Sequence, residues 1–76
     1  MRPKNITPEL WDLVETGKIR KTSALYRWLN SDSGSVILYD KTFWIELHGY
    51  CSITDKARAE LKSVMAEVFN AEYYQL

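Results

Sequence analysis

The residue types that form a nucleophile and its base occur once each in this chain, as Cys51 and His48. A thiol becomes a nucleophile when a histidine lies within hydrogen-bond reach. The two residues are three apart, and side chains alternate between the faces of a strand, so this spacing places them on opposite faces unless the chain bends. No third residue that would orient the pair can be named. We therefore interpret His48 as an exposed turn residue beside Gly49, and Cys51 as a small buried side chain.

Other catalytic and metal-binding patterns are missing. The glycines are isolated at positions 17, 34 and 49, so there is no glycine-rich phosphate loop. One Cys and one His supply neither a disulfide nor the four ligands of a tetrahedral zinc site. Ten Asp and Glu residues leave a carboxylate pair open, but 76 residues leave little room for a pocket. The sequence predicts a non-enzymatic protein without a metal or other cofactor.

Length and composition predict a single domain over residues 1–76. Hydrophobic residues make up 46% and aromatic residues 13%, which is enough for a packed core. The longest apolar run, Val36–Tyr39, is far shorter than the ~20 residues that cross a bilayer. The first ten residues contain no apolar segment of a secretory signal. We expect a cytoplasmic protein that does not enter a membrane, and the single Cys51 fits a reducing compartment.

The charges are unevenly distributed although they balance overall. A formal charge of zero and a pI near 6.6 exclude a strongly basic nucleic-acid module. Residues 1–30 contain six Lys and Arg against three acids, whereas residues 31–76 contain four against seven. A basic stripe beside a helix is the electrostatic footprint of phosphate binding. The alternative is that Lys18–Lys21 is a solvated connector.

Two short helices are predicted in the first part of the chain. Thr7 has the properties of an N-cap, Pro8 suits the first helical position, and Gly17 is a natural stop, so we expect a helix over residues 8 to about 16. Thr22 or Ser23 then caps a helix over residues 24–30. Its core face comprises Leu25, Trp28 and Leu29, and its other side carries Ser23, Tyr26, Arg27 and Asn30.

The period changes after residue 34 to that of strands. Val36–Tyr39 and Phe43–Leu47 are predicted strands around a short turn, and Tyr50–Ile53 is a predicted third strand. Thr54 begins the last helix, which is expected to run to about residue 72. Its apolar stripe comprises Ala57, Leu61, Val64, Met65, Val68 and Phe69. The expected class is α+β, with two short helices, a two- or three-stranded antiparallel sheet and a long carboxy-terminal helix.

Two stretches of the chain resemble known DNA-binding families. The segments ITPELW and SALYRWL resemble the opening of lambda-type excisionases. The segment YCSITDKARAEL resembles the wing-to-helix junction of MarR-like regulators, with Ala57 where those proteins carry Gly. The resemblance implies a winged-helix fold and a phage or mobile-element regulator of transcription or recombination.

The resemblance also implies which residues would contact DNA. The second helix would read bases in the major groove through Ser23, Tyr26, Arg27 and Asn30. Phosphates would be held by Lys18, Arg20 and Lys21. The hairpin would supply a wing tip at Lys41 and Thr42, although this turn is shorter and less basic than the wings of those families.

A protein-binding function is the alternative. If Phe43 and Ile45 point inward, Trp44 points outward and shares its sheet face with Glu46 and His48. An exposed aromatic residue on a sheet suits a protein contact, unless the last helix covers it. The anchors would be Trp44, Tyr26, Tyr73 and Tyr74. The protein would then be an inhibitor or adaptor that binds a host protein such as the transcription machinery, and the apolar carboxy-terminal segment leaves a homodimer open.

Overall fold

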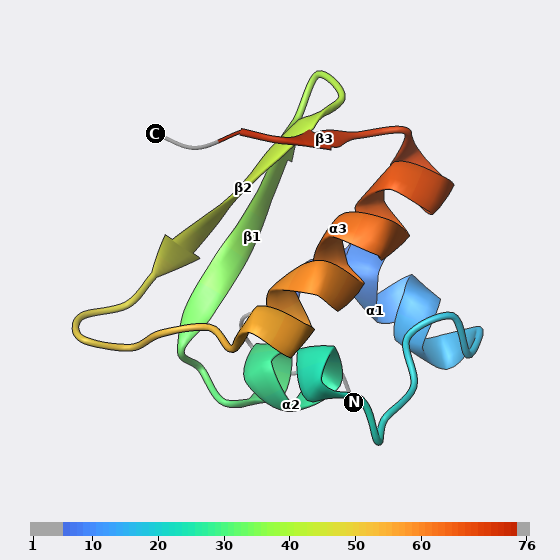
Figure 1. Cartoon of the computed structure of the whole chain (residues 1–76). Helices are drawn as coiled ribbons and strands as arrows, with labels where there is room; N and C mark the ends of the chain where they lie inside the picture. The colour runs from blue at the N-terminus through green and yellow to red at the C-terminus, as the bar shows by residue number, and fades with distance from the viewer. Residues whose placement is uncertain (1–5, 75–76) are drawn as a thin grey trace.

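Within residues 6–74, which the computed structural model describes, a three-stranded sheet carries three helices on one of its faces (Figure 1). The α+β class predicted from the sequence is confirmed, including the long carboxy-terminal helix. The elements follow in the order α1 (Pro8–Glu15), α2 (Ala24–Asn30), β1 (Gly34–Tyr39), β2 (Thr42–Leu47), α3 (Asp55–Phe69) and β3 (Glu72–Tyr73).

Side-chain caps set the starts of the helices. The hydroxyls of Thr7, Ser23 and Thr54 each accept a hydrogen bond from the backbone N–H three residues later, at distances of 3.4, 3.0 and 3.1 Å. These bonds satisfy donors that a helix cannot pair internally. The helix α1 ends at Glu15, two residues before Gly17, whose φ of 86° suits a glycine. The predicted ranges of the first two helices are therefore confirmed.

The strands β1 and β2 form an antiparallel hairpin whose register decides which side chains face the helices. Val36 lies opposite Ile45 on the inner face, and Ile37 lies opposite Trp44 on the other face. The connection is a two-residue turn in which Asp40 and Lys41 have φ values of 49° and 63°. Positive φ at both positions matches the right-handed twist of the strands, even though neither residue is a glycine.

The third strand is not where the sequence placed it. The prediction for Tyr50–Ile53 is wrong, because these residues form an irregular connection in which Tyr50 is fully exposed. The third strand is instead β3, which follows α3 and pairs with β2 in parallel, so the sheet is mixed. A parallel partner requires a crossover, and α3 supplies it. The helix ends at Phe69 rather than near residue 72 because Asn70 takes a left-handed φ of 52°.

The core lies between the inner face of the sheet and the three helices. It is formed by Ile6, Leu10, Leu13, Val14, Ile19, Leu25, Trp28, Leu29, Val36, Phe43, Ile53, Ala57, Leu61, Met65 and Ala71. On α3, Ala57, Leu61 and Met65 are buried, whereas Val68 in the last turn is exposed. Ile37 and Trp44 are outside this cluster, and the three described helices all lie on the other face of the sheet (Figure 1).

The contact between α2 and the start of β1 gives a stability prediction. A Cβ atom at Gly34 would lie 2.5 Å from the Glu46 carbonyl oxygen and 2.7 Å from the Trp28 ring. We expect Gly34→Ala to lower the free energy of unfolding by about 1–3 kcal/mol, because backbone or indole must shift. Urea unfolding measures this. The control Gly17→Asn, in open space with a φ that Asn tolerates, should change the free energy of unfolding much less. Equal stability of the wild type and Gly34→Ala would contradict the close packing at Gly34.

Candidate interaction surfaces

The exposed side of α2 carries part of the predicted base-reading set. Leu25, Trp28 and Leu29 are buried, and Arg27 and Asn30 are exposed, as predicted. The other two residues of that set are engaged within the protein, as their contacts show.

Ser23 and Tyr26 both have structural contacts. The Ser23 hydroxyl accepts from the Tyr26 N–H and donates to the Arg20 carbonyl at 2.7 Å. The Tyr26 side chain is half-buried against the core. Arg27 and Asn30 are therefore the members of this set whose side chains extend freely from α2.

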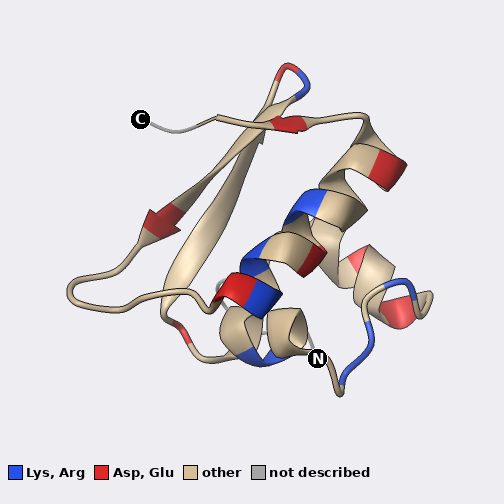
Figure 2. Cartoon of the chain, viewed as in Figure 1, with Lys and Arg blue, Asp and Glu red and all other residues tan. Residues whose placement is uncertain are grey.

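The connector Lys18–Lys21 lies beside acidic residues of α3. Ile19 is buried and anchors the connector, while Lys18, Arg20 and Lys21 are exposed. The Lys18 Nζ lies 3.6 Å from the Glu67 Oε1. A hollow of about 370 Å³ between the connector and α3 is lined by Lys18, Arg20, Glu60 and Glu67 among others. Figure 2 shows acidic and basic segments close together here, so this region is not a uniform basic stripe.

The hairpin turn lies far from α2. The helix leads directly into the start of β1, and the turn is at the other end of that strand (Figure 1). Six residues of strand span about 20 Å. The Thr42 hydroxyl donates to the Tyr39 carbonyl, and the Lys41 carbonyl accepts from Glu72 N–H. The structure therefore does not bring Lys41 and Thr42 together with Arg27.

A second hollow does combine two cations. It lies between α2 and the start of α3, measures about 530 Å³, and is lined by Ala24, Arg27, Trp28, Ser31, Ser33, Ser52, Thr54 and Lys56. None of these described lining residues is acidic. Sequence reasoning missed Lys56, because only the tertiary fold places it near Arg27.

The face of the sheet turned away from the helices carries an apolar cluster. Ile37 and Trp44 lie opposite each other on it, and Tyr39, 72% exposed, is on the same face of β1. Tyr74 follows β3, is 53% exposed, and donates its N–H to the Phe43 carbonyl at 2.7 Å, which places it beside β2. By strand alternation it joins this face. We call Ile37, Tyr39, Trp44 and Tyr74 the outer sheet cluster.

The outward direction of Trp44 is confirmed, whereas two of the other predicted anchors lie elsewhere. The Tyr73 ring is on the helix side, 5.4 Å from the Phe43 ring centroid, with the Lys62 Nζ 4.9 Å from the centroid of Tyr73. Tyr26 belongs to α2. Sequence reasoning missed Ile37 and Tyr39, although the alternation that places Trp44 outside also applies to β1.

A polar cluster around His48 lies at the other end of the outer sheet face, near the start of β1. The His48 Nδ1 lies 3.3 Å from the Asp32 carbonyl, and its Nε2 lies 3.2 Å from the Ser35 hydroxyl. A carbonyl only accepts, so Nδ1 carries the proton in the neutral ring and Ser35 donates to Nε2. His48 is thus half-buried and links the end of β2 to Asp32 and Ser35 at the start of β1. The prediction that Cys51 is buried is wrong, because its side chain is exposed in the connection after β2.

Other site types receive no support from the described part of the chain. Residues 6–74 contain no group of three His, Cys, Asp or Glu side chains that would hold a metal ion. None of their helices is long and apolar enough to cross a membrane. No family model, curated protein or solved structure matches this chain.

The orientation of α2 depends on a carboxylate of α3. The Glu60 Oε2 accepts from the Leu25 N–H at 3.0 Å, which satisfies a free donor at the start of α2. We expect Glu60→Ala to cost about 1–2 kcal/mol of stability, since the acceptor is charged and part-buried. Thermal unfolding measures this. The control Glu67→Ala removes an exposed ion pair and should cost less than about 0.5 kcal/mol; equal costs would contradict the capping role.

Proposed function

We propose that this chain is a non-enzymatic protein-binding module, an inhibitor or adaptor, that holds its partner against the outer sheet cluster. The observation that carries the proposal is that Ile37 and Trp44 lie opposite each other on the sheet face turned away from the helices, half-buried and outside the core, beside the exposed Tyr39. Aromatic side chains on a rigid strand pair are typical anchors of protein interfaces, since they supply large apolar area at a small entropic cost.

The charges around the cluster indicate the chemistry of the partner. Glu46 and Glu72 are exposed and share the outer face by their register with Ser35 and Thr42. Lys41 is in the turn, outside the strands. Complementary potentials favour a partner whose apolar patch is bordered by Lys or Arg. The same two carboxylates disfavour nucleic acid on this face.

Substitutions in the cluster test the proposal. The tagged protein is incubated with an extract of the cells that produce it, at high salt and after nuclease treatment, and the retained protein is identified and titrated by calorimetry. We expect Trp44→Ser and Tyr39→Ser each to weaken binding by about tenfold or more, as for interface hot spots.

A matched control is available in Tyr50→Ser, because Tyr50 is fully exposed in the connection after β2. This variant should bind like the wild type. Circular dichroism verifies that all three variants fold. A partner retained equally by Trp44→Ser and the wild type would contradict the proposal.

DNA binding, as in a winged-helix-like regulator, is a second candidate, and the hollow between Arg27 and Lys56 is the observation that favours it. Two cations from different helices flank an opening lined by serine and threonine hydroxyls. Such groups suit the phosphates of a nucleic-acid backbone. In this form of the proposal Lys41 and Thr42 make no contact with the same stretch of DNA.

A salt titration with mixed-sequence DNA tests this candidate. The logarithm of the binding constant should fall steeply with the logarithm of salt concentration, by roughly 0.9 per phosphate contacted. Arg27→Ala and Lys56→Ala should each reduce this slope, whereas Lys41→Ala should not. Absence of binding at low salt would remove the candidate.

A further inference from the structure

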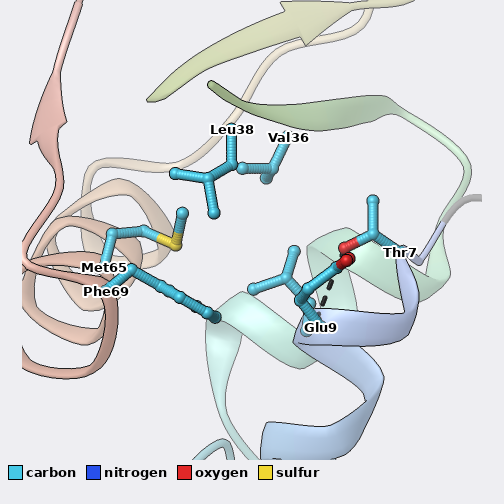
Figure 3. A pocket seen from close by; sticks show the side chains of 7 residues that line it. Thr7, Glu9, Val36, Leu38, Met65 and Phe69 are labelled. Atoms are coloured by element: carbon cyan, nitrogen blue, oxygen red, sulfur yellow. Dashed lines mark hydrogen bonds between the residues drawn. The ribbon is translucent and has the colours of Figure 1, made fainter. Parts of the chain in front are cut away.

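A small cavity lies between α1, β1 and α3, on the helix side of the sheet. Its volume is about 120 Å³. Figure 3 shows Val36 and Leu38 of β1 on one side, Met65 and Phe69 of α3 on another, and Thr7 and Glu9 at the start of α1 on a third. Leu10 completes the lining. The cavity is separate from the outer sheet cluster, so the following inference does not rest on the proposed function.

The lining is mostly apolar, and its polar side chains are those of Thr7 and Glu9. Leu10, Val36 and Met65 are buried, and Leu38, 38% exposed, forms part of the opening. The Thr7 hydroxyl accepts from the Leu10 N–H and is therefore already engaged. The remaining polar side chain is the Glu9 carboxylate, which is exposed. Apolar cavities of about 150 Å³ in proteins stay dry and bind benzene-sized molecules.

The described helix beside the opening is acidic. The helix α1 exposes Glu9, Asp12 and Glu15 and has no Lys or Arg. Glu9 and Asp12 are three residues apart and so lie on neighbouring positions of the helix surface. The positive amino-terminal end of the helix offsets only about half an elementary charge. The cavity thus joins an apolar interior to the Glu9 carboxylate, which attracts cations.

We propose that this cavity binds a branched aliphatic group that carries a positive charge a few bonds away. The aliphatic group enters between Leu38 and Phe69, and the cation remains at the rim near Glu9. Two sources share this chemistry. One is a small alkylammonium ion, and the other is a Leu side chain flanked by Lys in a peptide.

Methyl NMR spectra of the whole protein test the proposal. The probes are isoamylamine, isoamyl alcohol and isovalerate, which share one hydrocarbon body and differ in charge. We expect saturable shifts of the Met65 and Leu38 methyl signals, with isoamylamine binding about two- to fivefold more tightly than the alcohol and isovalerate most weakly. Acetyl-Lys-Leu-Lys-amide and acetyl-Glu-Leu-Glu-amide form the peptide arm of the experiment. Tighter binding of the lysine peptide than of isoamylamine identifies a protein segment, and not a small alkylammonium ion, as the source of the aliphatic group.

Two variants test the contributions of the Glu9 charge and of the apolar cavity separately. Glu9→Gln, at an exposed position, should remove the preference for the amine and leave binding of the alcohol unchanged. Leu38→Phe should fill the opening and abolish the shifts from every probe, while Tyr39→Phe on the other face should leave them intact. Absence of Met65 shifts with all probes, equal binding of isovalerate and isoamylamine, or persistence of the shifts in a folded Leu38→Phe variant would each overturn the proposal.

Discussion

The packing of Trp28 between two other elements holds the fold in its observed arrangement. Its indole lies against Gly34 at the start of β1 and donates its N–H to the Ser52 carbonyl at 3.2 Å, just before α3 begins. The helix α2 has only seven residues, which is too short to be stable alone. The helix is stabilised instead by the burial of Leu25, Trp28 and Leu29. Each of these side chains contributes roughly 1.5–3 kcal/mol. The positions of the candidate interaction surfaces follow from this attachment of α2.

Because α2 is attached at one end of the sheet, the candidate interaction surfaces lie on different parts of the molecule. Arg27 points away from the core next to the start of α3, whereas the hairpin turn is at the far end of β1. All three described helices share one face of the sheet, and the opposite face keeps Ile37 and Trp44 outside the core. A small domain has a large surface relative to its volume, so a sheet with only one face covered by helices is expected. The outer sheet cluster, in which Ile37 and Trp44 are half-buried and Tyr39 and Tyr74 are exposed, fits that expectation.

Local signals in the sequence predicted the elements that depend on neighbouring residues. Thr7 and Ser23 define helix starts through bonds that span three residues, and strand alternation placed Trp44 outside. Features that depend on long-range contacts have no local signal in the sequence. β3 forms because the left-handed Asn70 ends α3 early and directs the chain to β2, and Lys56 approaches Arg27 only after α2 and α3 pack. Cys51 was predicted to lie in a strand because the residues Tyr50–Ile53 have the composition of a short strand.

The exposure of the outer sheet face can be measured without any partner. A soluble nitroxide broadens the NMR signals of atoms that it approaches and leaves buried atoms sharp. The account predicts strong broadening of the Trp44 indole N–H and the Ile37 methyl signals, with Val36 and Phe43 on the opposite face nearly unaffected. If Trp44 and Ile37 were as protected as Phe43 in the dilute protein, another part of the chain or a second copy would cover this face, and the central claim would be contradicted.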